Sequence, residues 1–407
     1  MKNQRNFPFV TITKKAEYSI KTGHPWVYDA EITSAGDTIE NGALVDVFSE
    51  KGSYLGTGFY SVHSKIRVRI LSDNANEKFE KSFFERRIKY AINYRKTVMQ
   101  DDFSCCRLIF GEADGLPGLT IDKFSDIIVT QVLSYGIDKI KDMIYDIVYS
   151  ELSKSGIEIK GIYERNDVAI RELEGLTQYK GWYEKIPHQQ ETCTEICENG
   201  VFYKVDFENG QKTGFFLDQK YNRKEIARLA KGKKVLDCFT HTGSFALNAA
   251  FGGAEHVTAV DVSATAIECA KANADRNGLS DKMDFITADV FDLLPSLEKE
   301  KNNFYDFIIL DPPAFTKSRK TVGNAERGYK EINYRALKLL PRGGYFATCS
   351  CSHFMKDELF VKMLKSAARD AGVSLKQIEA RQQAPDHPIL WNVPETDYLK
   401  FYIFQVV

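Results

Sequence analysis

Two cysteines near the end of the chain are the residues with the clearest chemical potential. They lie in the stretch GGYFATCSCSHF, residues 343–354, which reads as a buried strand ending in Cys349 and Cys351, with His353 two positions later. A pair of this kind can bind a metal, form a disulfide, fill the core or supply a nucleophilic thiolate. The rest of the chain has to decide among these four roles.

The cysteine spacing disfavours a metal site and a disulfide framework. The chain has eight cysteines but no C-x-x-C pair, so a tetrahedral zinc site would need unusual spacing and we expect no metal. The N-terminal stretch MKNQRNFPFV has no apolar signal region, and no run is long enough to span a bilayer. We therefore expect a cytoplasmic protein with reduced thiols and no membrane partner.

A second group of candidate residues follows apolar stretches of the third quarter of the chain. Asp237 ends KKVLDCF and precedes a turn that contains Thr240, Thr242 and Gly243. A glycine there lets the backbone approach a ligand, and the following helix offers unpaired N–H groups. Asp261 ends HVTAVDVS, 18 residues past Gly243, where it is suitably placed to accept hydrogen bonds from both hydroxyls of a ribose. This arrangement predicts a nucleoside-containing cofactor.

The third apolar stretch and the glycine count narrow the choice of cofactor. Asp289 closes MDFITADV, where it can hold the exocyclic amine of adenine. The turn CFTHTGSF has one glycine, too few for the pyrophosphate of a dinucleotide, whereas S-adenosylmethionine carries no phosphate. Carboxylates at strand ends are often helix N-caps, but three in succession favour a nucleoside site. Ser263 and Val290, beside these acids, complete the cofactor set predicted here.

The fourth apolar stretch ends in IILDPPAF and predicts a substrate site. The fixed φ angles of Pro312 and Pro313, and their missing N–H groups, leave carbonyl groups free to accept hydrogen bonds from the amino edge of a base. Phe315 can stack on that base. We assign Asp311 to catalysis and to the lining of the cofactor site, and the other three residues to substrate binding.

The pattern of strands and helices that must position these residues predicts a multidomain α/β protein. Residues 1–74 alternate apolar and polar positions between turns, as in a small β-barrel. Residues 75–190 predict a connector helix near 79–99, two strands around a turn, a helix near 137–154 and a further strand, hence a central α+β domain. Residues 191–407 alternate strands and helices, which predicts a Rossmann-like parallel sheet with ligands beyond its carboxyl ends.

Charge is unevenly distributed along a chain whose net charge is only -1. Between residues 61 and 100 there are ten basic and four acidic residues, so the local charge is 10 − 4 = +6. Such an excess is typical of a surface that binds phosphates, and equally of a solvated helix face; both interpretations stay open. Lys65, Arg67 and Arg69 are the candidates for phosphate contacts.

Nearly the whole chain, from GHPWVY at residue 23 through DHPILWNVPE, resembles the bacterial large-subunit ribosomal RNA methyltransferases that form 5-methylcytidine. The stretches GEADGLPGLTID, YERNDVAIRELEG, KTGFFLDQ, DPPAF, RGYKEIN and CSCS match that family in order and spacing. The resemblance implies a class I S-adenosylmethionine-dependent enzyme, an N-terminal PUA barrel that binds RNA, and large-subunit ribosomal RNA as the partner. It also implies that Asp218 and Gln219 help to enclose the cofactor. A homodimer is left open.

The resemblance also implies a role for each cysteine. Cys351 holds the place of the family's SCS nucleophile, whose thiolate adds to C6 of cytosine and makes C5 reactive. Cys349 is expected in the core, and Asp311 is expected to bind the N3 or N4 edge of the base. Many related RNA enzymes carry a second cysteine where Ala314 stands, so the base that removes the C5 proton is not identified.

Two other functions remain in view. The first is methylation of an exocyclic amine of adenine or guanine through Asp311, Pro312 and Pro313, for which Cys351 has no use. The second is a non-catalytic RNA-binding assembly factor, which the intact set of strand-end acids disfavours. A nicotinamide dehydrogenase is a distant further alternative, because the glycines of a dinucleotide site are missing.

Overall fold

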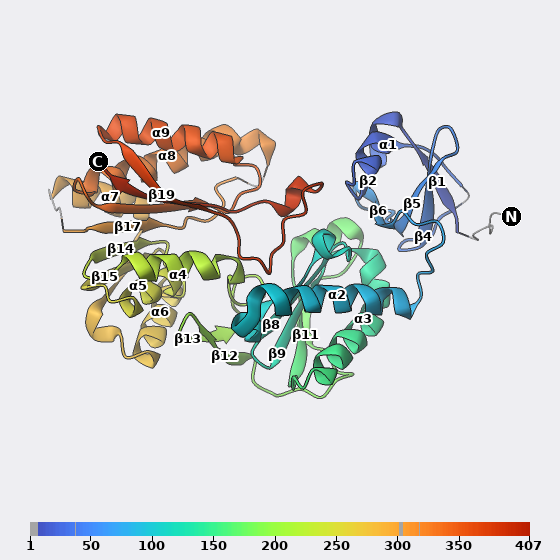
Figure 1. Cartoon of the computed structure of the whole chain (residues 1–407), viewed down its shortest axis with the longest axis horizontal. Coiled ribbons are helices and arrows are strands. Elements are labelled where there is room, and N and C mark those ends of the chain that lie inside the picture. The colour runs from blue at the N-terminus through green and yellow to red at the C-terminus, as the bar shows by residue number, and fades with distance from the viewer. Residues whose placement is uncertain (1–6, 37, 301–303, 317) are drawn as a thin grey trace. The chain divides into compact units, whose positions relative to one another are not determined.

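The computed structural model describes residues 7–36, 38–300, 304–316 and 318–407, which form two compact units (Figure 1). Unit 1 holds both the barrel and the central domain expected from the sequence. Two later segments, residues 205–217 and 385–396, also belong to unit 1, although the sequence assigns them to the third domain. The unit boundaries are Met1–Ile196, Val205–Leu217 and Pro385–Thr396 for unit 1, and Cys197–Lys204, Asp218–Ala384 and Asp397–Val407 for unit 2.

The N-terminal part of unit 1 is a six-stranded mixed sheet around one apolar core, in the order β2-β6-β5-β4-β1-β3. β1 runs parallel to β4, and the other neighbours are antiparallel. Helix α1 was not expected from the sequence; the hydroxyl of Thr13 caps it by accepting a hydrogen bond from the N–H of Ala16. The elements are β1 (Phe9–Ile12), α1 (Lys14–Lys21), β2 (Trp26–Tyr28), β3 (Ile32–Ala35), β4 (Leu44–Ser49), β5 (Tyr54–Tyr60) and β6 (Ile66–Ser72).

The central part of unit 1 is a five-stranded sheet in the order β11-β10-β9-β8-β7 with two long helices. The sequence predicts two strands around a turn here, which is wrong, because a hairpin of β8 and β9 follows β7. Its tight turn contains Ser125, whose φ of 57° is unusual for a residue other than glycine, so no glycine marks the turn in the sequence. The elements are α2 (Lys81–Met99), β7 (Cys105–Phe110), β8 (Leu119–Phe124), β9 (Ile127–Val132), α3 (Tyr135–Lys154), β10 (Gly161–Asn166) and β11 (Tyr179–Trp182).

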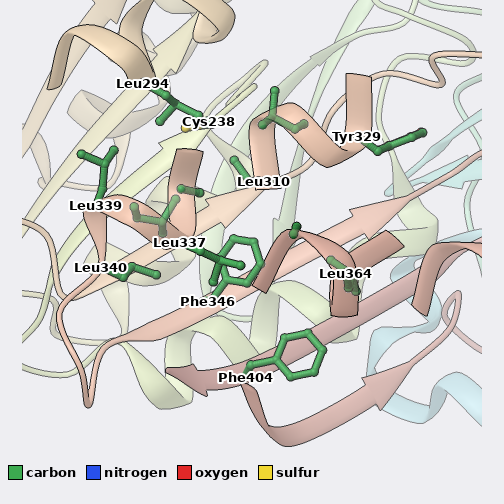
Figure 2. Close-up of a cluster of buried hydrophobic side chains, with 14 of the residues drawn as sticks. Cys238, Leu294, Leu310, Tyr329, Leu337, Leu339, Leu340, Phe346, Leu364 and Phe404 are labelled. Carbon is green, nitrogen blue, oxygen red and sulfur yellow. The ribbon is translucent and has the colours of Figure 1, made fainter. Parts of the chain in front are cut away.

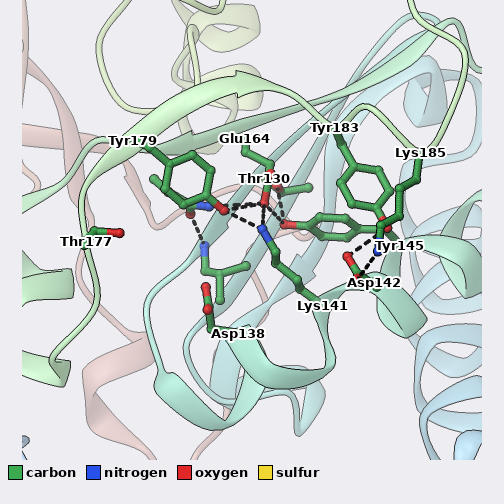
Figure 3. Close-up of polar contacts among 12 residues, drawn as sticks. Thr130, Asp138, Lys141, Asp142, Tyr145, Glu164, Thr177, Tyr179, Tyr183 and Lys185 are labelled. Carbon is green, nitrogen blue, oxygen red and sulfur yellow. Dashed lines mark hydrogen bonds and ion pairs between the residues drawn. The ribbon is translucent and has the colours of Figure 1, made fainter.

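A buried polar network fastens α3 to this five-stranded sheet. Figure 3 shows three side chains pointing at the carboxylate of Glu164. One oxygen of that carboxylate accepts hydrogen bonds from Lys141 at 2.8 Å, Tyr145 at 3.1 Å and Tyr179 at 2.8 Å. Because each donor comes from α3 or β11, the network ties these elements to β10.

Unit 2 is built on a seven-stranded sheet in the order β16-β15-β14-β17-β18-β20-β19. The five strands from β16 to β18 are parallel, as expected, but β20 runs antiparallel between β18 and β19. The prediction of a parallel sheet is therefore wrong for the last two strands in this order, β20 and β19. The elements are α4 (Lys220–Leu229), β14 (Lys234–Cys238), α5 (Ser244–Phe251), β15 (His256–Asp261), α6 (Ala264–Arg276), β16 (Met283–Thr287), α7 (Val290–Lys299), β17 (Phe307–Leu310), α8 (Val322–Leu339), β18 (Tyr345–Ser350), α9 (Asp357–Ala371), β19 (Leu375–Arg381) and β20 (Lys400–Val406). A separate two-stranded sheet pairs β12 (Cys193–Glu198) with β13 (Val201–Asp206).

Helices cover both faces of this sheet (Figure 1), with α4, α5 and α6 on one side and α7, α8 and α9 on the other. On the second side, Cys238, Leu310 and Phe346 point from the sheet into a cluster that also holds Leu294 and Leu364 from the helices (Figure 2). Burial of such side chains stabilises the fold by roughly 1.5 to 3 kcal/mol each. The core thereby fixes the strands whose carboxyl ends carry the candidate residues. In the described part of the chain, no helix is long and apolar enough to cross a membrane.

Candidate active site

Four parallel strands of unit 2 bring the predicted acids and thiols to one edge of the sheet. β15, β14, β17 and β18 are direct neighbours, and their carboxyl ends carry Asp261, Asp237, Asp311 and Cys349. Both Asp311 and Asp261 act electrostatically on Asp237. The fold thus gathers residues that are far apart in the sequence, as ligand sites of open parallel sheets require.

Asp237 lies fully buried below the turn that joins β14 to α5. One carboxylate oxygen, Oδ2, accepts hydrogen bonds from the hydroxyl of Thr240 at 2.6 Å and from the N–H of Ala246 at 2.9 Å. The other, Oδ1, has no hydrogen-bond partner among the described residues. Burial is the main cause that raises the pKa of Asp237 to about 8; the two hydrogen bonds oppose the shift, and the nearby Asp311 and Asp261 add to it.

The turn above Asp237 is held in a strained conformation. Phe239 and His241 have φ angles of 66° and 51°, in the left-handed region that side chains other than glycine rarely adopt. Gly243 has a φ of 82°, and a Cβ atom there would lie 3.0 Å from the Cβ of Ala270. Left-handed residues other than glycine cost about 1 to 3 kcal/mol each and cluster at ligand sites. The side-chain oxygen of Thr242 is also buried without a hydrogen-bond partner among the described residues.

Asp261 shapes the same turn from the end of β15. Its Oδ2 accepts a hydrogen bond from the N–H of His241 at 2.9 Å, and its Oδ1 accepts one from the N–H of Ser263 at 2.9 Å. Burial lowers the pKa of His241, which favours the neutral imidazole, although Asp261 opposes the shift. The hydroxyl of Ser263 caps α6 through the N–H of Ala266.

Asp289 and Val290 begin α7. The carboxylate of Asp289 is exposed and accepts a hydrogen bond from the N–H of Phe291 at 2.8 Å, so it is the N-cap of the helix. The side chain of Val290 belongs to the buried core. The helix-capping role that the sequence left open for such acids is therefore present at Asp289.

Exposed apolar side chains surround these acids. Val262 follows Asp261 directly and is 69% exposed, and Ile286 and Phe291 are 36% and 40% exposed near the end of β16 and the start of α7. Apolar surface next to a carboxylate suits a nucleoside, whose base is flat and whose ribose carries hydroxyl donors. Together with the unpartnered Oδ1 of Asp237, which can accept a hydrogen bond from an ammonium group, these residues fit S-adenosylmethionine.

Asp218 and Gln219 precede α4 and are both buried. The carboxylate of Asp218 accepts a hydrogen bond from the hydroxyl of Tyr398 at 2.6 Å. The amide of Gln219 lies 3.4 Å from Oδ1 of Asp311 and 3.5 Å from the sulfur of Cys349. Gln219 therefore contacts the two residues, Asp311 and Cys349, at the carboxyl ends of β17 and β18.

Cys349 is buried, as expected, but it is more than a core residue. Its thiol donates a hydrogen bond to Oδ1 of Asp311 at 2.8 Å. Burial raises the pKa of Cys349 well above its usual value, and the Asp311 charge adds to the shift, so this thiol stays protonated. The Asp311 carboxylate, predicted to bind the edge of a base, is thus held by a thiol and an amide.

Cys351 follows the last residue of β18 and is half-buried. The residues on either side of it are anchored: the hydroxyl of Ser350 donates to the hydroxyl of Tyr329 at 3.0 Å, and the hydroxyl of Ser352 donates to the carbonyl of Thr316 at 3.0 Å. These two bonds fix the residues that flank Cys351 against α8 and against the segment after Asp311. His353 is exposed, and its ring contacts Phe354.

Lys400 is the residue at this edge that sequence reasoning missed. It begins β20, where it pairs with Ser350 of β18, and only 7% of its surface is exposed. The one signal in the sequence was a lysine heading the apolar run KFYIFQVV. That signal was insufficient, because only the antiparallel pairing of β20 with β18 brings Lys400 beside the cysteines.

The residues assigned to the substrate differ in exposure. Pro312 is buried and Pro313 is exposed, in the segment that follows β17. The ring of Phe315 packs against Tyr329 at 4.6 Å and Phe291 at 5.8 Å between ring centroids. Much of the Phe315 ring is therefore engaged within the protein.

The three basic residues assigned to phosphates lie in unit 1 in different settings. Lys65 is exposed. Arg67 forms an ion pair with Asp29 and also donates to two main-chain carbonyls. Arg69 is buried and pairs with Glu174 at 2.7 Å. Of the three, Lys65 has the most freely available charge. No group of three or more metal-binding side chains occurs within the part of the chain that the structure describes.

Comparison with known proteins agrees with this fold. A family model of S-adenosylmethionine-dependent methyltransferases matches residues 181–404, and a model of PUA-like domains matches residues 10–73. Ribosomal RNA large subunit methyltransferase I of Pseudoalteromonas atlantica is 42% identical over 401 residues, which cover 98% of this chain and 99% of that protein. The protein of the same name from Klebsiella pneumoniae is 37% identical over 403 residues, with 98% and 99% covered.

Two solved structures share the whole fold at low sequence identity. A protein of Streptococcus mutans assigned as a SAM-dependent methyltransferase superposes with a TM-score of 0.82 at 22% identity, covering 98% of this chain and 99% of that chain. A protein assigned as a methyltransferase, in complex with SAH, gives a TM-score of 0.83 at 22% identity with the same coverage.

The fold and the match to the two family models define the protein as an S-adenosylmethionine-dependent methyltransferase with a PUA-like N-terminal domain. The acids at the carboxyl ends of the strands agree with this class. S-Adenosylmethionine is its cofactor. Within that class, the chain belongs to the family of the ribosomal RNA large subunit methyltransferase I proteins, which it matches over almost its entire length.

Proposed function

We propose that the protein methylates C5 of a cytidine in large-subunit ribosomal RNA through a covalent bond between Cys351 and C6 of the base. The observation that carries the proposal is the place of Cys351. Cys351 is half-buried and directly follows β18, the neighbour of the strand that leads into Asp311. Methylation of an exocyclic amine needs no thiol at this position, whereas C5 of cytosine is too weak a nucleophile without one.

The cofactor site proposed here is formed by Asp237, the strained turn before α5, Asp261 and the exposed Val262. Asp218, Gln219 and Asp289, which lie at the same end of unit 2, are proposed to complete it. S-Adenosylmethionine, when bound, supplies an electrophilic methyl group. The substrate proposed here is ribosomal RNA because relatives that match the whole chain carry that substrate in their names.

The proposed reaction balances without further reagents. The Cys351 thiolate adds to C6, so that an S–C6 bond forms and C5 becomes nucleophilic like an enamine carbon. C5 then takes the methyl group, whose bond to the sulfonium sulfur breaks and leaves a neutral thioether. A base removes the C5 proton, and the S–C6 bond breaks to restore the aromatic ring. The Asp311 carboxylate, oriented by Cys349 and Gln219, is proposed to bind the N3 or N4 edge of cytosine during the addition.

The test is Cys351→Ser, assayed on a large-subunit ribosomal RNA transcript. We expect methylation to fall below detection, because a serine hydroxyl of much higher pKa supplies almost no nucleophile near neutral pH. RNA that contains 5-fluorocytidine should trap a protein–RNA adduct with the wild type. The base cannot remove fluorine from C5 as it removes a proton, so the S–C6 bond does not break. Cys351→Ser should form no adduct.

Two control variants make the result specific. Cys269→Ser changes an exposed cysteine of α6 and should form the adduct at the wild-type level. Cys349→Ser keeps a hydrogen-bond donor toward Asp311 and should retain adduct formation. If Cys351→Ser forms the adduct as the wild type does, or if the product carries its methyl group on an exocyclic amine, the cytosine-C5 proposal is wrong and methylation of an amine replaces it.

A further inference from the structure

The ammonium group of Lys400 binds the main chain around Cys351. Its Nζ donates hydrogen bonds to the carbonyl of Ser352 at 2.8 Å and to the carbonyl of Tyr398 at 2.9 Å. The backbone of Lys400 pairs with Ser350 across the antiparallel ladder of β18 and β20. Lys400 therefore holds the residue before Cys351 through its backbone and the residue after Cys351 through its side chain.

The same ammonium group is a buried charge without a close ion pair. Among the described residues, no carboxylate lies within 4.0 Å of its nitrogen. Burial lowers the pKa of Lys400, and the groups that oppose this shift are, in order, Asp397, Cys351, Asp357 and Cys349. Two of these four groups are thiols at the end of β18, so the positive charge of Lys400 acts on them.

Three other titratable groups near this end of β18, namely Tyr329, Asp311 and Asp357, do not supply positive charge. Burial raises the pKa of Tyr329 on α8, which keeps its phenol neutral. Asp311, beyond β17, is acidic and is engaged by Cys349. The carboxylate of Asp357 on α9 is negatively charged and accepts a hydrogen bond from the hydroxyl of Tyr402 on β20 at 2.6 Å.

We propose that Lys400 is a positioning residue for Cys351: its ammonium group fixes the turn that carries the thiol and stabilises the thiolate by charge. A cation beside a cysteine favours the thiolate, which is the nucleophilic form. The catalytic meaning of this role rests on the proposed covalent mechanism. The effect on the thiol itself does not, so it can be measured without RNA.

The experiment measures how fast iodoacetamide alkylates Cys351 in the full chain, without RNA or cofactor, between pH 6 and 9.5. Peptide mass spectrometry separates Cys351 from the other cysteines, and the exposed Cys269 of the same molecule serves as the internal reference. Lys400→Gln keeps an amide that can donate hydrogen bonds to the two carbonyls but removes the charge. Lys400→Arg keeps the charge.

We expect Lys400→Gln to shift the midpoint of the Cys351 alkylation profile to higher pH by about one unit, and to slow alkylation at pH 7 on the order of tenfold relative to Cys269. Lys400→Arg should stay close to the wild type. Lys123→Met is the control, because Lys123 is also buried, donates to the carbonyls of Ser104 and Ser125, and lies in unit 1. It should leave the Cys351 profile unchanged.

An unchanged midpoint in Lys400→Gln overturns the proposal. So does a loss of reactivity that is uniform at every pH, or an equal shift in Lys400→Arg, because either result points to altered packing and not to charge. A Lys400-dependent midpoint in a protein that forms no adduct with 5-fluorocytidine RNA supports the role of Lys400 and removes the cytosine-C5 function, so the two failures are distinguishable.

Discussion

The arginines of the central part of unit 1 and the buried ionisable groups at the carboxyl edge of the seven-stranded sheet of unit 2 have different kinds of partner. In unit 1 the arginines pair with opposite charge: Arg107 binds Asp122 through two hydrogen bonds of 2.7 and 2.9 Å, and Arg171 binds Asp138 at 3.1 Å. Lys123 of β8 is an exception, because it is buried and donates to the carbonyls of Ser104 and Ser125. At the edge in unit 2, Asp237 and Lys400 make hydrogen bonds to neutral groups instead.

This difference in partners distinguishes charges that stabilise the fold from groups that are available for chemistry. A buried charge with a close partner of opposite sign keeps its ionisation state over a wide pH range, and losing the partner is costly. A buried group that binds only neutral donors or acceptors has its pKa displaced toward the neutral form, as seen for Asp237 and Lys400. Displaced pKa values are typical of functional sites, and two of them lie at the edge of unit 2 where we propose the active site. Burial also lowers the pKa of Lys123 in unit 1, so the shift supports the proposal only together with the geometry of the site.

The contrast belongs to the sheet edge and not to unit 2 as a whole. Arg223 of α4 and Glu198 of β12 form a fully buried bidentate pair with hydrogen bonds of 2.6 and 2.9 Å in unit 2. This pair resembles the pairs of unit 1, and it joins two elements that carry no candidate catalytic residue. Unit 2 can therefore neutralise a buried charge, but does not do so at the edge.

The largest effect that tests this contrast is expected for Asp122→Asn. The change removes the charge that faces Arg107 and weakens the acceptor for the hydroxyl of Thr213, which lies 2.6 Å away. Breaking a buried pair by removing one partner costs about 3 to 5 kcal/mol, so the free energy of unfolding of unit 1 should fall by that amount. All three tryptophans, Trp26, Trp182 and Trp391, lie in unit 1, so tryptophan fluorescence during urea unfolding reports on this unit.

The control for that measurement is Asp126→Asn in the same hairpin. Asp126 pairs with Lys160, whose side chain is largely exposed to solvent. Exposed pairs contribute little, so the unfolding midpoint should hardly move. A similar loss of stability in both variants would mean that the buried pair of unit 1 is not special, and the contrast between the two regions would disappear.

Sequence patterns predicted the edge of unit 2 better than the elements that complete it. The strands that carry or lead to Asp237, Asp261 and Asp289 were predicted because each apolar stretch reaches an acid near its end. β19 was missed because its residues are mostly polar or half-buried, as befits an edge strand. The sequence also gave no sign of the direction of β20, which depends on pairing between distant segments.

The same limit applies to side-chain contacts. The hydrogen bond between Cys349 and Asp311 joins residues 38 positions apart, and apolar periodicity marks Cys349 only as core. The strand-end acids were proposed as ligands of the cofactor, whereas much of their hydrogen bonding shapes the turns that would hold it. Pattern reasoning identifies which residues reach an edge, but the balance of their contacts depends on tertiary packing.

A second effect is expected from Asp237, and it varies with pH. The pKa of this carboxyl group is about 8 in the folded chain and lower in the unfolded chain, so the folded state binds the extra proton in between. The stability of unit 2 should therefore fall as the pH rises from about 4 to about 8, by at most about 1.4 kcal/mol per pH unit, and level off above that range. Asp237→Asn should remove this fall.

The measurement is the difference in unfolding free energy between the wild type and Asp237→Asn, followed by circular dichroism across that pH range. Asp281→Asn, an exposed acid between α6 and β16, is the control, and its difference from the wild type should not vary in this way. A difference for Asp237→Asn that is constant with pH would show that its carboxylate is ionised in the fold, like the paired acids of unit 1.

The smallest effect concerns basic residues of the N-terminal sheet and applies the same contrast to RNA binding. A basic side chain that contacts phosphate releases counterions, so the logarithm of the binding constant falls with the logarithm of the salt concentration by about one unit of slope per contact or somewhat less. Lys65 is exposed, whereas Arg69 is buried against Glu174. We propose that Lys65 contacts RNA phosphates and that Arg69 serves the fold.

Lys65→Ala should therefore flatten the salt dependence of binding to a large-subunit ribosomal RNA transcript by about one unit, measured by fluorescence anisotropy between 50 and 300 mM salt. Arg69→Ala should leave the slope unchanged but lower the unfolding midpoint of unit 1, because it leaves Glu174 as a buried charge without its cation. Each variant removes one positive charge, from Arg69 within β6 or from Lys65 directly before it. Net charge alone therefore predicts equal slopes for the two variants. Equal flattening by both would mean that the Arg69–Glu174 pair opens when RNA binds, and that burial in the free protein does not separate structural from RNA-binding charges in unit 1.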